Sequence, residues 1–541
     1  MDILSPVAPL PVTKLPLLSR PASLRGASIA LVDNQRPAAK AILDAARRHL
    51  QGLGARVTLV PKRHGSAPLD DAQQQRIRRE CQAVVFGVGD HRPSALYAGY
   101  EAASLEREGV PAVVLCTQDF PLHAQVVTTS MGVPGLPVIV ASPSANEWLD
   151  ALAVALIEAP EALDAAYQGR YCSRAQAEAY LGLVSHGQPM DTGVVRMDGG
   201  YDGFHALAAR WRWSDGLPVF PPTPERVASM VQVSRRAPGE VVALVPPRFG
   251  EATVERVAAN AVMAGCLPRE MPAVIAAVQA LSKPGMNAFG LLLGTGPQAP
   301  MVCINGPARK ALEVNCRHNV LGAGRAANGT IARALRFVIA NIGGCIPEVT
   351  DLAAMGSPAK YAFCFGENEE ESPWPGLHTT RGLPKEASAV TVALVRGVFD
   401  ISSAATTPDD IVKALAQGMS VRSTANLYYG GEMVLLLCLQ WAKTLQAAGV
   451  SRADLQRRLF EALQVPLSSL TQPDMDALRA FRSDEFPDLD TRSCAPPVRG
   501  PDDILVVVTG GAPGPHSACC PTSGGLSWSQ TVRIADGNGA P

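Results

Sequence analysis

The chain has 541 residues, which is too long for one ordinary hydrophobic core, so two or three domains are expected. Apolar residues make up 47% of the chain and charged residues 18%, a composition that is typical of globular proteins and excludes a disordered chain. The net charge of -1 argues against a nucleic-acid-binding protein and against a polybasic membrane protein.

The N-terminal residues do not have the pattern of a targeting segment. Residues 1–20 contain four prolines and lack the basic start and the continuous apolar run of a signal peptide. No stretch reaches the roughly 18 apolar residues of a membrane-spanning helix, and the twelve cysteines form no CxxC pair. We therefore expect a cytoplasmic protein without membrane or nucleic-acid partners and without a metal site, whose residues 1–22 form a disordered tail. No cofactor is indicated, and a homo-oligomer stays open.

Residues 23–165 alternate short apolar runs with helix-like segments. This alternation predicts a parallel sheet with helices on its faces. Ligands of such sheets bind at the carboxyl ends of the strands, which here carry residues 33–34, 87–94 and 116–120. The expected strands are residues 28–32, 56–60, 83–87, 111–116 and 137–141.

A second alternating pattern begins near residue 215 and defines a larger domain, residues 215–541. Residues 166–214 are mixed, with glycine and aromatic residues, and are interpreted as a connector. The expected fold class is α/β, with two α/β lobes whose mainly parallel or mixed sheets are flanked by helices. The strands expected in the larger domain are residues 241–245, 302–305, 390–395 and 504–508.

Two stretches of the first lobe carry a family resemblance. VVFGVGD at residues 84–90 and EREGVPAVVLCT at residues 106–117 resemble the UGSC-motif selenoproteins and, more distantly, selenoprotein B of the glycine and sarcosine reductases. SPAKYAFCFGENEEESPW at residues 357–374 and similar long strings within residues 215–520 resemble the larger partner region found with UGSC proteins. The resemblance implies a thiol- or selenol-associated enzyme in which the two regions are fused.

The chain departs from this family at the position that matters most. In the relatives, the loop after VGD carries selenocysteine or cysteine and a second cysteine, whereas this chain reads Asp90-His91-Arg92-Pro93-Ser94. Gln440-Trp441 also stands where the relatives are expected to carry Glu-His. Two interpretations stay open for the loop: His91 and Arg92 bind an anion or supply a base, or the site is inactive.

Cys266 is the candidate nucleophile. Gly265 before it and Pro268 after it predict a thiol at a helix N-terminus. The helix amides and Arg269 would then stabilise a thiolate and lower the pKa of the thiol. The alternative is a small buried cysteine at a helix corner.

The sequence GAGRAANGT at residues 322–330 precedes a predicted helix and is a candidate anion site. Glycines allow backbone N–H groups to approach a ligand, and a helix start favours negative charge. Its spacing fits neither the dinucleotide-binding nor the P-loop pattern, and a simple glycine-rich turn is the alternative. The residues assigned to anion binding are Gly322, Gly324, Arg325, Asn328 and Thr330.

Glu369 and His516 are the candidate proton carriers. Glu369 belongs to an acidic loop that offers a general base, and an unperturbed imidazole titrates near neutral pH. A solvated acidic loop and a loop histidine are the alternatives.

Two functions follow from these candidates. The first is an enzyme that acts on a small anionic substrate, by thiol-dependent cleavage or reduction at a carbon–heteroatom bond, with Cys266 as nucleophile. The reaction class comes from the resemblance to the reductases. The second is a non-catalytic binding or carrier protein for a small molecule, whose first lobe has lost the redox pair.

Overall fold

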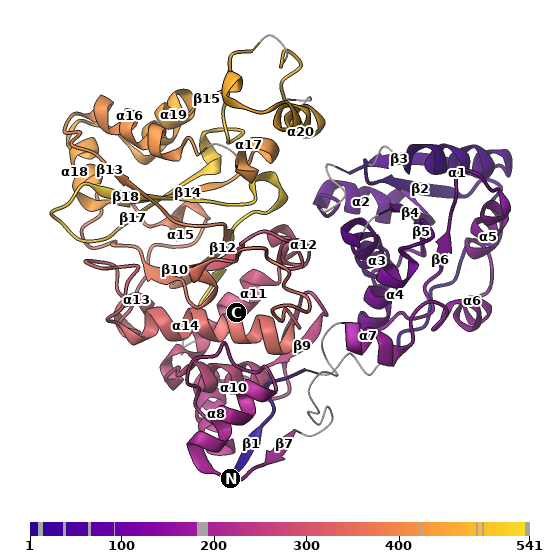
Figure 1. The fold of residues 1–541 in the computed structure, drawn as a ribbon, viewed down its shortest axis with the longest axis horizontal. Coiled ribbons are helices and arrows are strands. Elements are labelled where there is room, and N and C mark those ends of the chain that lie inside the picture. The colour runs from indigo at the N-terminus through magenta and orange to yellow at the C-terminus, as the bar shows by residue number, and fades with distance from the viewer. Residues whose placement is uncertain are drawn as a thin grey trace.

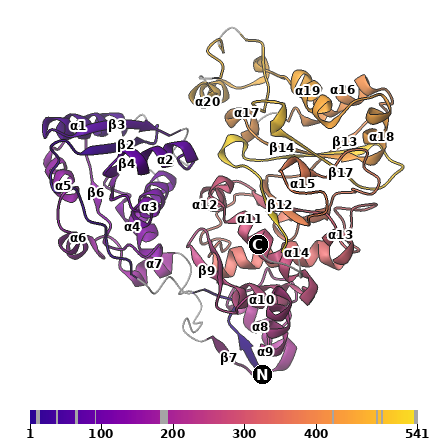
Figure 2. The same ribbon diagram turned by 180° about the vertical axis from the view of Figure 1, so that it is seen from behind.

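The computed structural model describes residues 1–8, 14–35, 39–62, 67–90, 92–180, 193–421, 424–482, 485–489 and 492–535. The fold is α/β, with parallel and mixed sheets flanked by helices, which confirms the predicted fold class. Figures 1 and 2 show the elements of residues 28–180, coloured from indigo to purple, grouped beside the elements of the rest of the chain. No helix within the described ranges is long and apolar enough to cross a membrane.

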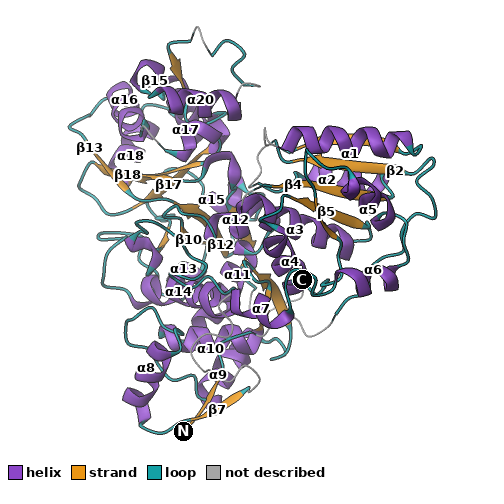
Figure 3. Ribbon diagram, turned by 45° about the vertical axis from the view of Figure 1, so that its right-hand side comes forward, coloured by secondary structure: helices purple, strands orange, loops and turns teal. Residues whose placement is uncertain are grey.

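A five-stranded parallel sheet with the order β3-β2-β4-β5-β6 forms the centre of residues 14–180. All five strands predicted for this region are present. Helices α1 and α5 pack on each other, as do α3 and α4, and Figure 3 shows the sheet between these pairs. The elements are β2 (Ser28–Asp33), α1 (Lys40–Gly52), β3 (Arg56–Pro61), α2 (Asp71–Glu80), β4 (Ala83–Gly89), α3 (Arg92–Arg107), β5 (Ala112–Cys116), α4 (Pro121–Ser130), β6 (Val138–Val140), α5 (Glu147–Ala155), α6 (Pro160–Tyr167) and α7 (Arg174–Tyr180).

The strand order reverses between β2 and β4, which places the ends of these two strands at a topological switch point. Asn34 follows β2, and its side-chain amide donates to the Val88 carbonyl of β4 at 2.6 Å. Helix α3 begins at Arg92, just beyond β4. The fold therefore positions the N-terminal turn of α3 where ligands of such sheets usually bind.

Residues 193–535 contain two four-stranded sheets, with the orders β11-β10-β12-β19 and β13-β18-β14-β17. Each sheet has one parallel pair, β10 with β11 and β14 with β17. The strands are β7 (Val194–Arg196), β8 (Val241–Val245), β9 (Gly250–Thr253), β10 (Ala299–Asn305), β11 (Cys364–Gly366), β12 (Ala389–Val395), β13 (Phe399–Ser402), β14 (Met433–Cys438), β15 (Val465–Pro466), β16 (Cys494–Ala495), β17 (Ile504–Thr509), β18 (His516–Pro521) and β19 (Gln530–Arg533).

Helices flank these sheets, and α8 to α12 come between β7 and β10 in the chain. The α-helices are α8 (Gly200–Arg210), α9 (Pro224–Ser234), α10 (Val254–Ala264), α11 (Met271–Leu281), α12 (Ala288–Leu292), α13 (Ala308–Ala311), α14 (Ala326–Phe337), α15 (Leu377–Thr380), α16 (Pro408–Met419), α17 (Ala425–Tyr429), α18 (Leu439–Ala447), α19 (Arg452–Ala462) and α20 (Gln472–Arg482).

The predicted disordered tail is wrong for the described part of residues 1–22. Strand β1 (Asp2–Leu4) pairs antiparallel with β7, and the Ile3 side chain is fully buried in the core that α8 to α11 share. Figure 1 shows this indigo strand beside β7. Farther along, Arg20 forms a buried ion pair of 2.6 Å with Glu106 of α3. The segment is ordered because its apolar and charged side chains find partners in two separate parts of the chain.

The predicted connector also contains more structure than expected. Its residues 181–192 lie outside the described ranges, but α8 packs into the core through Phe204, and Trp213 is almost fully buried. Phe204 and Trp213, two aromatic residues of the predicted connector, are therefore core residues of the larger region.

Aromatic rings join the two regions. Tyr100 of α3 stacks on Phe249, with ring centroids 4.9 Å apart, and on Phe289 of α12 at 5.1 Å. Tyr97, three residues earlier in α3, meets Phe289 edge-on at 5.2 Å. The Tyr97 hydroxyl lies directly against Gly290, where any side chain would collide with it. This contact holds α3 beside α12 and forms one side of the site described below.

Candidate functional site

A pocket of about 430 Å³ lies where α3 meets the larger region. Helix α3 contributes Arg92, Leu96 and Tyr97, and the chain from α12 to β10 contributes a wall that runs from Phe289 to Gln298. The remaining wall comes from residues that follow β12, from α17 and from the segment before β19. These residues are Arg396, Ala425, Tyr429, Ser523 and Leu526.

The charge of this pocket is one-sided. The described residues that line it include two arginines, Arg92 and Arg396, and no carboxylate. The Arg92 guanidinium lies over the ring of Tyr180, 5.3 Å from its centroid, a contact with a neutral ring that does not cancel its positive charge. Arg396 is half-buried, and this burial lowers the pKa of its guanidinium. Burial also raises the pKa of the neighbouring Tyr429, an effect that the charge of Arg396 opposes.

Arg396 is held by neutral partners. With its amide carbonyl facing the arginine, Gln298 accepts from Arg396 Nη1 at 2.9 Å and from Ser523 Oγ at 3.1 Å, and its amide nitrogen donates to the Gly296 carbonyl at 2.8 Å. This orientation satisfies both ends of the amide. Gln298 therefore orients the guanidinium and leaves its charge free for a ligand.

Comparison with known proteins assigns the part of the chain that carries Arg92. Residues 2–165 match the model of the UGSC family. This part of the chain is a UGSC-family domain. No curated protein matches the chain. The likeness of residues 215–520 to a UGSC partner region, and that of the first domain to selenoprotein B, stay predictions.

One residue of the loop that replaces the relatives' redox pair reaches the pocket. Arg92 lines the pocket from the first turn of α3, directly after the strand that carries the VGD sequence. His91, its predicted partner in anion binding, lies outside the described residues. The other pocket arginine, Arg396, was not predicted. Its sequence signal was a cation directly after the predicted strand of residues 390–395.

Cys266 does not have the surroundings that its sequence predicted. It follows the C-terminal cap of α10, and its thiol donates to the Thr330 carbonyl at 3.3 Å. Arg269, the expected cation, forms an exposed ion pair with Glu313. Burial, and then the negative charge of Glu270, raise the pKa of the Cys266 thiol well above its usual value. The predicted lowering of this pKa is therefore wrong, because Glu270 and not Arg269 faces the thiol.

The glycine-rich segment divides into an exposed and a buried part. Gly322, Gly324 and Arg325 are exposed, and Arg325 lines a second depression of about 410 Å³ together with Arg309, Lys310 and Arg317. Glu313 and Glu370 also line this depression, and Glu370 contacts both Arg309 and Lys310. Carboxylates of the chain thus already offset part of its positive charge.

Asn328 and Thr330 have structural partners. The Asn328 side chain accepts from the Asn315 N–H at 2.8 Å and donates to the Cys364 carbonyl at 3.0 Å, which fastens the loop before α14 to β11. The Thr330 hydroxyl donates to Glu270 at 2.7 Å. Neither residue lines the depression beside Arg325.

The other two catalytic candidates have separate partners. One oxygen of Glu369 accepts from the Gly306 N–H at 2.8 Å, from Asn305 at 3.0 Å and from Arg309 at 3.1 Å. His516 is exposed on β18 and lies 3.4 Å from Asp400. Within the described ranges, Cys266, Glu369 and His516 share no interaction partner, so the structure does not assemble them into one site.

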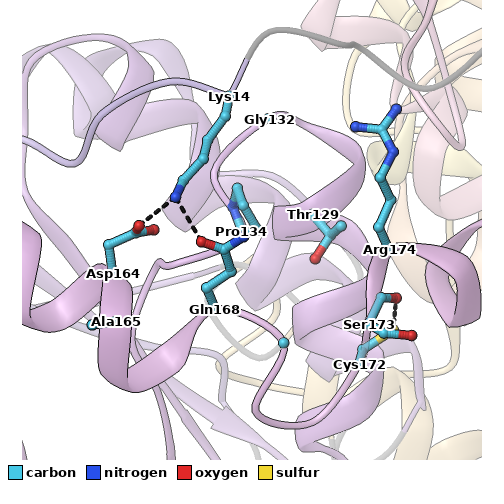
Figure 4. A pocket seen from close by; sticks show the side chains of 11 residues that line it. Lys14, Thr129, Gly132, Pro134, Asp164, Ala165, Gln168, Cys172, Ser173 and Arg174 are labelled. Carbon is cyan, nitrogen blue, oxygen red and sulfur yellow. Dashed lines mark hydrogen bonds and ion pairs between the residues drawn. The ribbon is translucent and has the colours of Figure 1, made fainter.

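A further pocket, of about 440 Å³, lies within the UGSC domain. Figure 4 shows Lys14 reaching to Asp164 and Gln168 of the α6 region, with a hydrogen bond of 2.6 Å to Gln168 and an ion pair to Asp164. Lys14 is paired in this pocket, and Arg174 also lines it. Its contacts attach residue 14 to the end of α6.

Proposed function

We propose that the protein binds a small organic anion in the pocket lined by Arg92 and Arg396. The observation that carries the proposal is the presence of two guanidinium groups and no carboxylate among the described lining residues. Guanidinium groups bind carboxylates and phosphates through paired charge-assisted hydrogen bonds. The volume of about 430 Å³ falls within the range of small-molecule sites.

A binding or carrier role is better supported than thiol-dependent cleavage or reduction. No cysteine is among the described residues that line the pocket. Burial raises the pKa of every buried cysteine thiol, which disfavours the nucleophilic thiolate. The proposal therefore keeps the small anionic ligand and the cytoplasmic location of the protein that the sequence predicts. It gives the ligand a site without a thiol.

Thermal unfolding in the presence of anions tests this proposal. Acetate, a panel of larger organic carboxylates, phosphate and sulfate are added to the full chain at matched ionic strength, with chloride as the reference. A ligand that binds only the folded state increases the free energy of unfolding by mass action, by about 2.7 kcal/mol at a hundredfold excess over its Kd. The melting temperature therefore rises. Arg396→Gln and Arg92→Gln should each weaken the affinity for the anion about tenfold or more, and so reduce the rise in melting temperature.

Arg325→Gln is the matched control, because it removes an arginine from the other depression. It should leave the anion effect unchanged. If Arg325→Gln alone abolishes the effect, the anion binds at the glycine-rich segment, as the sequence predicted. Equal melting temperatures in all anions for the unmodified protein would refute the binding function.

A further inference from the structure

The pocket with Arg92 and Arg396 offers a ligand more apolar surface than an inorganic anion can use. Side chains of Leu96, Phe289, Leu291, Leu293, Leu352 and Leu526 line it, together with the rings of Tyr97 and Tyr429. Phosphate or sulfate would touch the guanidinium groups and leave this surface in contact with water. An apolar group on the ligand would instead be buried, at a gain of about 25 cal/mol for each Å² removed from water.

The polar groups of the pocket gather around Arg396. Gln298 and Ser523 are almost fully buried there, and the three side chains form one hydrogen-bonded group with the Gly296 carbonyl. Gln298 accepts a hydrogen bond from one nitrogen of the guanidinium, Nη1. The other N–H groups of the planar guanidinium match the two oxygens of a carboxylate. The group therefore presents one oriented positive charge at one end of an apolar cavity.

We infer that the ligand is an amphipathic carboxylate, with its carboxylate on Arg396 and an aromatic or branched aliphatic body against the leucine and phenylalanine side chains. This inference rests on the proposed function and adds the chemical class of the ligand. Arg92 then supplies long-range attraction from α3, where its guanidinium lies over the Tyr180 ring. Gln298 is a positioning residue, since it acts through the orientation of Arg396.

Four probes separate the apolar and the charged part of this recognition. They are 3-phenylpropionate, acetate, the uncharged 3-phenylpropanamide and inorganic phosphate, each titrated into the full chain by calorimetry. We expect 3-phenylpropionate to bind about tenfold or more tightly than acetate, than the amide and than phosphate. The gain over acetate comes from apolar burial, and the gain over the amide from the ion pair.

Three variants assign these gains to residues. Leu293→Ala changes a half-buried side chain and should reduce the advantage of 3-phenylpropionate over acetate. Arg396→Gln should remove its advantage over the amide. Gln298→Leu should weaken the acid several-fold more than the amide, which a loss of packing alone would not do, because packing affects both probes equally.

The outcomes separate this inference from the function on which it rests. If phosphate or acetate binds as tightly as 3-phenylpropionate, and Arg396→Gln weakens that binding, the pocket binds anions and the ligand class is wrong. If the acid and the amide bind equally, the assignment of a carboxylate is overturned. If none of the anions binds in a way that depends on Arg396 or Arg92, the proposed function itself fails.

Discussion

At Gly296, the absence of a side chain decides whether Arg396 has room beside Gln298. A Cβ atom at this position would lie 2.6 Å from the end of the Gln298 amide and 2.9 Å from Arg396 Nη1, closer than packed atoms approach. Both neighbours are the ends of long side chains, so they would move rather than break the fold. The orientation of the pocket arginine thus depends on a residue that carries no chemistry of its own.

The surroundings of Cys266 give a prediction at the same scale. Because burial and Glu270 raise the pKa of this thiol, iodoacetamide at neutral pH should leave Cys266 unmodified in the folded protein. Cys494 and Cys81, which are half-exposed, should react first. Mass spectrometry of the labelled protein measures the order. Modification of Cys266 before both of these cysteines would restore it as a candidate nucleophile.

At the scale of elements, a bidentate ion pair helps to join the loop after β11 to α13. Glu370 accepts from Arg309 Nη1 at 2.9 Å and from Nη2 at 2.8 Å, a bidentate arrangement between two segments that follow neighbouring parallel strands. Hydrogen bonds from Arg309 hold the pKa of Glu370 at about 2, well below the usual range of a glutamate side chain. The contact fixes the two loops that surround Glu369.

Glu370→Gln tests the stability that this ion pair supplies. Because the folded-state pKa is depressed, the pair stabilises the folded state above pH 4.5 and loses this effect as the pH falls toward about 2. The variant should be less stable by about 1 kcal/mol at neutral pH, after allowance for solvent exposure. Denaturant unfolding at several pH values measures the difference, which should vanish near pH 2.

Glu371→Gln is the matched control for this experiment. Glu371 pairs with Arg317 and Lys443, whose side chains are more than half exposed, so its loss should change stability by less. Equal effects of the two substitutions at every pH would show that the bidentate pair contributes no more to the free energy of unfolding than an exposed ion pair.

At the scale of the whole molecule, the chain passes from the larger region into the UGSC domain and back. Strand β1 belongs to the core of the larger region, whereas the sheet of the UGSC domain begins at β2. The family match starts at residue 2 and therefore includes a strand whose partner, β7, lies beyond the match. The two regions are thus joined by this strand as well as by the rings around Tyr100.

Ile3→Asp tests the role of β1 in the larger region. A carboxylate in place of this fully buried side chain should destabilise the folded state by about 3 kcal/mol or more. Thermal unfolding should show a lower melting temperature by several degrees. Asp2→Asn is the control, since Asp2 forms an exposed pair with Arg196 and should have little effect. An unchanged melting temperature in Ile3→Asp would mean that β1 does not contribute to the core.

The sequence by itself determined the sheet of the UGSC domain and the position of Arg92 at its edge. Its five strands are short apolar runs bounded by turns and polar residues, and this local signal does not depend on distant contacts. The apolar pattern of the sequence does not indicate helix α2, because this helix is almost wholly polar. Its start is set instead by Asp70 and Gln73, which cap each other's backbone N–H groups.

Only the tertiary structure decided the site. Arg92 begins helix α3 after a strand of one sheet, and Arg396 follows a strand of another sheet, far apart in the sequence. They line one pocket because aromatic rings hold α3 beside α12. The direction of the pKa shift of Cys266 could not be predicted from the sequence either, because it depends on burial and on Glu270. Local patterns specify strands and helices, but the charge and burial around a side chain depend on which segments pack against it, and that is a property of the folded chain.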